Sequence, residues 1–297
     1  MPFVHYQVSL PLITPATGGT IEIINVNSVP TAVHTFTSSG TFTTVSPIAA
    51  VGYLIVGGGG GGGGGGSPSS NVYYNGGGGG AGGYVETGST SPSLPASTAY
   101  SIVVGSGGTG GDGVSVAPTS GTSSSAFGFT ALGGGHGGQL ITGTSPATGG
   151  SGGGGSGGGT YPWQSRTQQN GAAGIQNSTY GYGRGFAGAI GKTIIGDISI
   201  GGGGGGANGS PTEANNGGFG RPNSITGTSI VYACGGAGSF SAFQPEDNNV
   251  AGSAPNTFGG GGGGGTARLV SVYGTGRISG TNGNPGIVII RYPLVIV

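Results

Sequence analysis

The sequence predicts an all-β protein, an antiparallel β-sandwich of jelly-roll type whose long glycine-rich loops pack as polyglycine II helices. Three observations lead to this prediction. Short runs rich in Val, Ile, Thr, Phe and Tyr alternate with runs of glycine, no segment keeps a 3.6-residue apolar period, and 80 of the 297 residues are Gly. The chain also contains 12 Tyr, 10 Phe and 1 Trp, which is enough apolar surface to exclude disorder as its main state.

The predicted strands are short and are bounded by Gly, Pro, Asn and Ser, the residues that favour turns. Many short strands with such boundaries are typical of a sandwich, because each strand must return across the same core. In chain order we expect strands at residues 4–10, 20–25, 33–37, 41–45, 51–56, 84–87, 100–104, 124–132, 194–200, 230–233, 269–273 and 287–292.

Glycine runs occupy the spaces between these strands. Ten consecutive glycines, as at 57–66, would form a flexible linker unless each residue is held in place, since glycine loses the most backbone entropy on ordering. Polyproline II helices, with three residues per turn, could hold them, because backbones without side chains approach closely enough to exchange lateral hydrogen bonds. We therefore expect the runs at 57–66 and 259–265 to lie inside a bundle of such helices.

One segment carries the pattern expected at the edge of such a bundle. Residues 105–113 read G-S-G-G-T-G-G-D-G, which places Ser106, Thr109 and Asp112 three residues apart. In a helix with three residues per turn these polar side chains would share one solvent-facing side. The period is local, so the long Gly-X-Y repeat of collagen is excluded.

The charge and cysteine content exclude several classes of partner and site. A net charge of zero argues against nucleic acid or an anionic membrane, although all seven basic residues lie at or after Arg166. Cys234 is the single cysteine, which excludes an intramolecular disulfide and a Cys-based zinc site. The first residues do not resemble a signal peptide and no apolar stretch is long enough to span a membrane. We therefore expect synthesis in the cytoplasm and no membrane insertion.

No residue pattern predicts catalysis, a cofactor or a bound metal. The three His, at positions 5, 34 and 136, have no metal-binding spacing with one another or with carboxylates. Ser151 matches G-x-S-x-G by letter, but it lies in a glycine run without the strand-to-helix turn of a nucleophile. The adjacent acids Glu246 and Asp247 indicate a turn, with calcium binding as the alternative. We expect a protein that is not an enzyme and needs no cofactor.

Aromatic residues gather in short stretches between the glycine runs. In residues 179–186, Tyr, Arg and Phe alternate with small residues, so an extended chain would direct them to one side. Tyr, Trp and Arg provide large contact areas at low entropic cost, which makes these stretches candidates for receptor recognition. The alternative is that the rings cap the ends of the glycine bundle as a small core. The candidate receptor-binding residues are Tyr73, Tyr74, Tyr161, Trp163, Arg166, Tyr180, Tyr182, Arg184, Phe186, Phe240 and Phe243.

Several junctions between strands and glycine runs match a known family. Residues 34–43 read H-T-F-T-S-S-G-T-F-T, and V-G-Y-L-I-V at 51–56 runs into glycines. With further pieces at 81–85, 100–105, 127–135 and 286–292, the sequence resembles the glycine-rich domain of bacteriophage tail fibres and receptor-binding proteins over about residues 32–293. The resemblance implies a β-sandwich with polyglycine loops, in which variable segments between the glycine motifs recognise the receptor, as in fibre-tip adhesins.

The resemblance further implies a virion protein with other virion proteins as partners. Its receptor would be a bacterial surface polysaccharide or an outer-membrane protein, contacted by loops 67–75, 160–190 and 207–258. A capsid-decorating or head-fibre protein without recognition is the structural alternative, and an ice-binding protein is a third. Residues 32–297 would form the glycine-rich domain, and residues 1–31 would either attach it to the virion or add a strand pair.

The C-terminal residues predict an assembly. Residues 294–297 read L-V-I-V, an apolar end that would be exposed to water in a lone subunit. Jelly-roll subunits often close such faces by symmetric association. We therefore expect a homo-oligomer, with a trimer as the favoured form.

Overall fold

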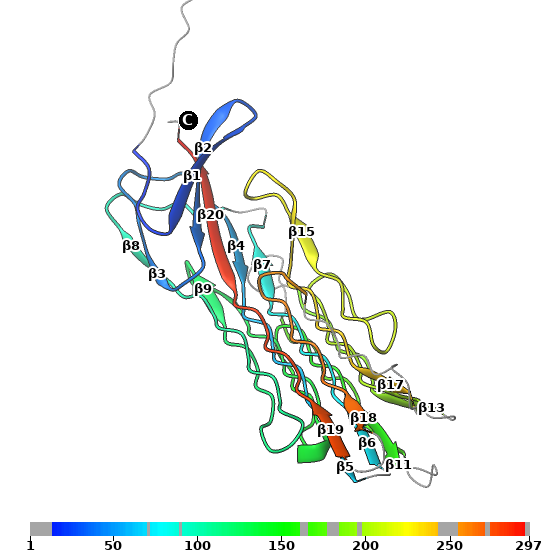
Figure 1. The fold of residues 1–297 in the computed structure, drawn as a ribbon. Coiled ribbons are helices and arrows are strands. Elements are labelled where there is room, and N and C mark those ends of the chain that lie inside the picture. The colour runs from blue at the N-terminus through cyan, green and yellow to red at the C-terminus, as the bar shows by residue number, and fades with distance from the viewer. Residues whose placement is uncertain are drawn as a thin grey trace, which may run out of the picture.

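The computed structural model describes residues 14–69, 72–88, 91–160, 166–176, 184–194, 198–242, 255–270 and 274–294. In these residues the protein is all-β, as predicted. Every pairing between named strands is antiparallel, and the helical part is the single turn η1 (Leu140–Thr142). The molecule is elongated, with a β-sandwich at one end, a second group of strands at the other and extended glycine-rich segments between them (Figure 1).

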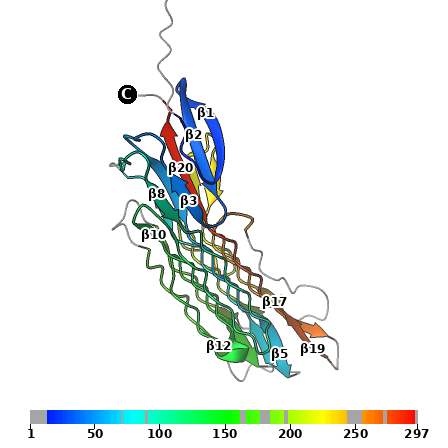
Figure 2. The ribbon, with the colours of Figure 1, turned by 90° about the vertical axis from the view of Figure 1, so that its left-hand side faces the viewer.

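The sandwich consists of a five-stranded sheet and an opposing layer of two strand pairs. An isolated bridge between Val103 and Ser125 joins those two pairs, and β3 and β8 lie against the large sheet in Figure 2. The antiparallel sandwich is thus confirmed, while its jelly-roll connectivity stays a prediction. In spatial order the large sheet contains β1 (Thr20–Val26), β2 (Val29–Phe36), β20 (Ile287–Pro293), β4 (Gly52–Val56) and β7 (Tyr84–Glu86), and the opposing layer contains β3 (Gly40–Thr43) with β8 (Ala99–Ile102) and β9 (Ser124–Ala126) with β10 (Phe129–Ala131).

Strand β4 lies between β20 and β7 in the large sheet and is buried on both faces. Tyr53 and Ile55 point into the core shared with the opposing layer, whereas Leu54 and Val56 point to the other face. There they pack in a second core with Tyr232 of β16 (Ile230–Tyr232), which pairs with β15 (Arg221–Asn223). Full burial of each such aliphatic side chain contributes roughly 1.5–3 kcal/mol, so apolar side chains hold this end of the molecule together.

Residues 57–64 form an interior helix of the glycine bundle. From residue 57, every third amide donates to a carbonyl in segment 77–83. The amides of residues 58 and 61 donate to carbonyls in segment 119–122, and the amides of residues 59 and 62 donate to carbonyls in segment 281–284. A partner that recurs at every third residue requires three residues per turn, which is the polyproline II geometry that the sequence predicts. The carbonyls of the same helix also change partner with a period of three residues. They accept hydrogen bonds from amides in segments 105–113, 132–138 and 259–265.

The close approach of these segments explains why their residues are glycine. A Cβ added to Gly61 would lie 1.9 Å from the carbonyl oxygen of Thr109, and one added to Gly62 would lie 2.0 Å from that of Gly263. Neither glycine has a positive φ, so the requirement comes from backbone packing and not from an unusual conformation. A side chain at either of these positions could not be accommodated without separating the helices.

The segment 105–113 lies at the edge of the bundle, as its polar stripe predicts. Ser106 and Thr109 are exposed and Asp112 is half-buried, whereas the glycines that precede each of them are buried. Side-chain oxygens act as acceptors where a further helix is missing. The Thr122 hydroxyl oxygen accepts from the Ser106 amide at 2.8 Å, and the Thr119 hydroxyl oxygen accepts from the Thr109 amide at 2.8 Å.

The strands at the far end of the bundle continue the glycine helices directly. Residues 57–64 join β4 to β5, and residues 76–83 join β6 to β7, so the chain crosses the bundle and returns within one hairpin. We call the strands at this far end of the bundle the distal strands. One distal sheet contains, in spatial order, β12 (Arg166–Gln168), β11 (Gly157–Thr160), β6 (Val72–Asn75), β5 (Gly65–Ser69), β19 (Gly274–Ile278) and β18 (Ala267–Val270), and the other contains β13 (Lys192–Ile194), β14 (Ile198–Ile200) and β17 (Phe240–Ala242).

Two predicted strands each contain residues of two strands that pair with each other in the structure. Residues 124–132 form β9 and β10, because Phe127 and Gly128 adopt φ values of 53° and 82° and turn the chain between them. Residues 194–200 include the end of β13 and all of β14, which pair with each other. The distal strands β5, β6, β11, β12, β17 and β19 were not predicted. Strands β5, β11 and β19 are glycine-rich, and β6, β12 and β17 have only three or four residues, so none shows a clear alternation of apolar and polar residues.

The structure describes part of each end of the chain. Thr17 bridges to Thr43, and the predicted domain boundary at residue 32 falls inside β2. The prediction that the apolar end is exposed is wrong for Leu294, which is 2% exposed because β20 carries it into the sandwich core. The predicted strand at 4–10 and residues 295–297 lie outside the described residues, so virion attachment and oligomerisation stay predictions.

Candidate functional site

The distal strands position the first of the predicted recognition residues. Tyr73 and Tyr74 belong to β6, and their register partners in β11 are Gly159 and Gly158. Tyr73 is 7% exposed, whereas Tyr74 is half-buried. The Tyr74 ring lies over Gly158, because a Cβ added to that glycine would be 2.4 Å from the ring carbon Cδ1. Both rings therefore help to close the end of the glycine bundle.

Two further predicted residues also belong to distal strands. Arg166 begins β12 opposite Gly159, and Phe240 begins β17 opposite Ile200. The segments that connect or follow these strands, 161–165 and 243–254, lie outside the described residues. The predicted residues in these two segments are Tyr161, Trp163 and Phe243.

Arg184 and Phe186 lie at the other end of the bundle, next to the sandwich. The backbone of Arg184 bridges to Tyr84 in β7, and the Nε of its guanidinium is buried without a hydrogen-bond partner among the described residues. Phe186 is 37% exposed, and its backbone amide donates a hydrogen bond to the Ser151 hydroxyl oxygen. Tyr180 and Tyr182 lie outside the described residues.

The predicted recognition residues that the structure describes therefore do not form one surface. The chain reverses direction at each end of the bundle, so segments that follow one another closely in sequence can be a bundle length apart. Arg166, for example, lies in a distal strand, whereas Gln176, which follows closely in sequence, lies at the sandwich end. There its Oε1 accepts a hydrogen bond from the Leu132 amide at 2.8 Å. Among the described candidates, Tyr73, Tyr74, Arg166 and Phe240 belong to distal strands, and Arg184 and Phe186 lie near the sandwich.

A polar cluster that the sequence did not predict fastens the loop containing β15 to β7. The Arg221 guanidinium donates to Glu86 Oε1 at 2.6 Å, and Asn223 and the Tyr84 hydroxyl donate to Oε2 at 2.9 and 2.8 Å. Burial, as the largest cause, raises the pKa of Tyr84 well above its usual value. Because every group in the cluster is paired, its role is structural. Contacts between residues so distant in sequence leave no local signal.

The histidines do not form a metal site in the part of the chain that the structure describes. His34 is buried, with Nδ1 2.8 Å from the Gly18 carbonyl oxygen and Nε2 3.0 Å from the Tyr292 hydroxyl. Burial lowers the pKa of His34, which favours the neutral ring. His136 is half-buried on the bundle. No group of three His, Cys, Asp or Glu side chains among these residues could hold a metal ion.

Within the same described ranges, no helix has the length and apolar character needed to cross a membrane. A family model described as a glycine-rich domain matches residues 36–293, which is most of the chain. The match begins at the end of β2 and ends with β20, so it includes the bundle, the distal strands and the sandwich except for β1 and most of β2. No curated protein matches the sequence. The chain belongs to the family of glycine-rich domains.

Proposed function

We propose that the protein is a bacteriophage virion component, a tail-fibre tip adhesin that binds a bacterial surface polysaccharide or an outer-membrane protein. The observation that carries the proposal is the position of the distal strands at the end of a glycine bundle whose helices are joined by lateral hydrogen bonds. The connections of these strands contain Tyr161, Trp163 and Phe243, with Arg166 and Phe240 in the flanking strands. Residues of this kind are enriched where proteins bind partners.

A hydrogen-bonded bundle suits this role. Each interior amide of residues 57–63 has a lateral partner, so the strands at its end are held without a large hydrophobic core. Preorganised contact residues lose less conformational entropy on binding, which favours affinity. The resemblance of the strand and glycine junctions to tail-fibre domains supports the virion setting. Other virion proteins and further copies of the chain, in a trimer, are the remaining proposed partners.

The structural alternative is a capsid-decorating or head-fibre protein that recognises no receptor. One observation favours it: Tyr73 is buried, and Tyr74 packs over Gly158, so aromatic rings at the distal end also serve as a capping core. The two functions make opposite demands on the remaining distal aromatics. An adhesin needs them accessible to a receptor, and a capping core needs them for stability.

The experiment is binding of the labelled full-length protein to a panel of bacterial strains, with thermal unfolding measured for each variant. Trp163→Ala removes an interface anchor, so binding should weaken about 30-fold, the equivalent of about 2 kcal/mol, while the melting temperature is kept. Phe219→Ala is the matched control, since Phe219 is 56% exposed beside β15, away from the distal strands. Unchanged binding together with a lowered melting temperature for Trp163→Ala would support the structural alternative instead.

A further inference from the structure

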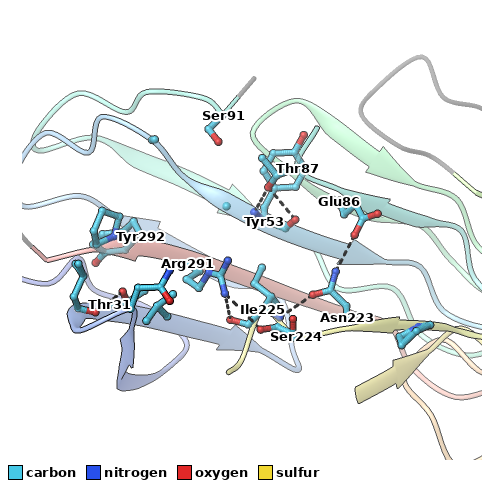
Figure 3. Close-up of a pocket in the computed structure, with 17 residues that line it drawn as sticks. Thr31, Tyr53, Glu86, Thr87, Ser91, Asn223, Ser224, Ile225, Arg291 and Tyr292 are labelled. Carbon is cyan, nitrogen blue, oxygen red and sulfur yellow. Dashed lines mark hydrogen bonds between the residues drawn. The ribbon is translucent and has the colours of Figure 1, made fainter. Parts of the chain in front are cut away.

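A cleft opens at the sandwich end, on the face of the large sheet beside β15 (Figure 3). Its volume is about 840 Å³, within the range of small-molecule sites. Strands β2, β4 and β20 form the floor, and the turn between β1 and β2 and the residues after β15 form the sides. The lining residues that matter here are Asn27, Thr31, Gly52, Ser91, Ser224 and Arg291.

The cleft is open because one floor residue has no side chain. Gly52 is the register partner of Arg291, so the two residues share a face of the sheet. A Cβ added to Gly52 would meet the Arg291 carbonyl oxygen at 3.5 Å and Thr87 Oγ1 at 3.9 Å, which are ordinary contacts. Glycine is therefore not needed for folding at this position, in contrast to the glycines of the bundle, and its effect is to leave the floor open.

The cleft has one positive charge without a carboxylate partner. Glu86 is fully engaged by Arg221, Asn223 and Tyr84, and the pair of Arg221 with Glu86 is the one salt bridge among the described residues. Arg291 reaches toward the opposite wall in Figure 3, where its Nη1 is 3.4 Å from the carbonyl oxygens of Ser224 and Ile225. These are long contacts, and the remaining donors of the guanidinium have no partner among the described residues.

Neutral polar groups surround this charge. The side chains of Asn27, Ser91 and Ser224 make no hydrogen bond to another described residue, and all three are exposed at the cleft. An amide and two hydroxyls can each donate and accept, which matches the hydroxyls of a sugar. The floor strand β20 is paired on both sides, by β2 and β4, so its backbone offers a peptide no free edge for strand addition.

From these observations we propose that the cleft binds an acidic sugar unit, with its carboxylate on Arg291 and its hydroxyls on the surrounding amide and hydroxyl side chains. A planar guanidinium pairs with a carboxylate through two parallel hydrogen bonds, which fixes the orientation of the sugar as well as its affinity. The site lies at the sandwich end, so it is separate from the distal strands and does not depend on the proposed adhesin function.

The test is saturation-transfer NMR on the full-length protein with glucuronate as the probe. Glucose lacks the carboxylate and acetate lacks the hydroxyls, so both should give weaker saturation than glucuronate. Arg291→Gln should weaken glucuronate binding about tenfold or more, because it removes charge-assisted hydrogen bonds. Gly52→Val should weaken it as strongly by filling the floor, and Arg277→Gln, the same change at an exposed arginine of β19, should leave it unchanged.

Three results would overturn the proposal. The first is equal saturation of glucuronate by the unaltered protein and by both cleft variants. The second is acetate binding as tight as glucuronate, which would indicate a simple anion site, and the third is tighter binding of an oligoglutamate peptide. Melting temperatures of the variants separate lost binding from lost folding. Since the bacterial-cell assay with Trp163→Ala uses the distal end, each proposal can fail alone.

Discussion

In the sandwich, order comes from side chains, whereas in the bundle it comes from their absence. Leu54 has no exposed surface and contributes by the apolar area that it buries. Gly61 is also buried, but its contribution is that it lets the Thr109 carbonyl approach. The two regions should therefore respond in opposite ways to a change of side-chain size. The sandwich is sensitive to lost volume, and the bundle is sensitive to added volume.

The energetic balance of the two regions differs as well. A lateral hydrogen bond in the bundle contributes a net of about 1 kcal/mol, and fixing the backbone of one residue costs about 1–2 kcal/mol. Each glycine helix is thus close to balance or unfavourable by itself. Residues 57–64 are connected directly to β4 at one end and to β5 at the other. These two strands hold the ends of the helix in place and so help to order it.

The largest effect should come from adding one methyl group inside the bundle. In Gly61→Ala the new Cβ would lie 1.9 Å from the Thr109 carbonyl oxygen, so the helices must separate and several lateral hydrogen bonds break. We expect loss of native folding, measured as soluble yield and as the cooperative thermal transition. Gly40→Ala is the control, because the nearest atom to its Cβ would be a Phe36 ring carbon at 3.6 Å. Full stability of Gly61→Ala would contradict the packed bundle.

A smaller loss should follow removal of volume from the sandwich. Leu54→Ala leaves a cavity between β4 and the second core, and such changes typically cost about 2–5 kcal/mol. Denaturant unfolding would measure this difference, with Ile23→Ala as the control, since Ile23 is 59% exposed on β1. If both variants lost the same stability, side-chain burial would not explain the order of the sandwich.

The smallest effect should occur at the edge of the bundle. Thr119→Val removes the hydroxyl oxygen that accepts from the Thr109 amide, but both residues are exposed and water can replace the acceptor. We expect a loss of about 0.5 kcal/mol or less in the same unfolding experiment. A loss of stability comparable to that of Leu54→Ala would mean that the edge hydroxyls are as important to the bundle as its interior hydrogen bonds. The contrast between interior and edge would then need revision.

Much of the bundle can be predicted from the sequence because its rule is local. A pure glycine run predicts an interior helix, and the spacing of Ser106, Thr109 and Asp112 predicts an edge, as the structure confirms. The rule fails at the distal strands. Gly65 and Gly66 begin β5 with the same residue type that forms the preceding helix, so composition does not mark the change from helix to strand.

The candidate sites were less predictable than the fold. Aromatic composition selected residues such as Tyr73 and Arg184, but the antiparallel course of the chain places them at opposite ends of the bundle. The cleft left no signal at all. Arg291 reads as one residue of an apolar strand, and Gly52 reads as one more glycine in a chain that has 80.

The sequence by itself determined the strand-rich composition, the position of the glycine runs and the three-residue spacing of the polar stripe, because each is a pattern of neighbours along the chain. The tertiary structure decided which segments lie side by side. Gly62 donates to Thr281 and Glu86 pairs with Arg221 across long stretches of chain, and Leu294 is buried because β20 lies in the middle of its sheet. Polyglycine backbones are nearly identical to one another, so only the strands and loops that join them can specify which helices become neighbours.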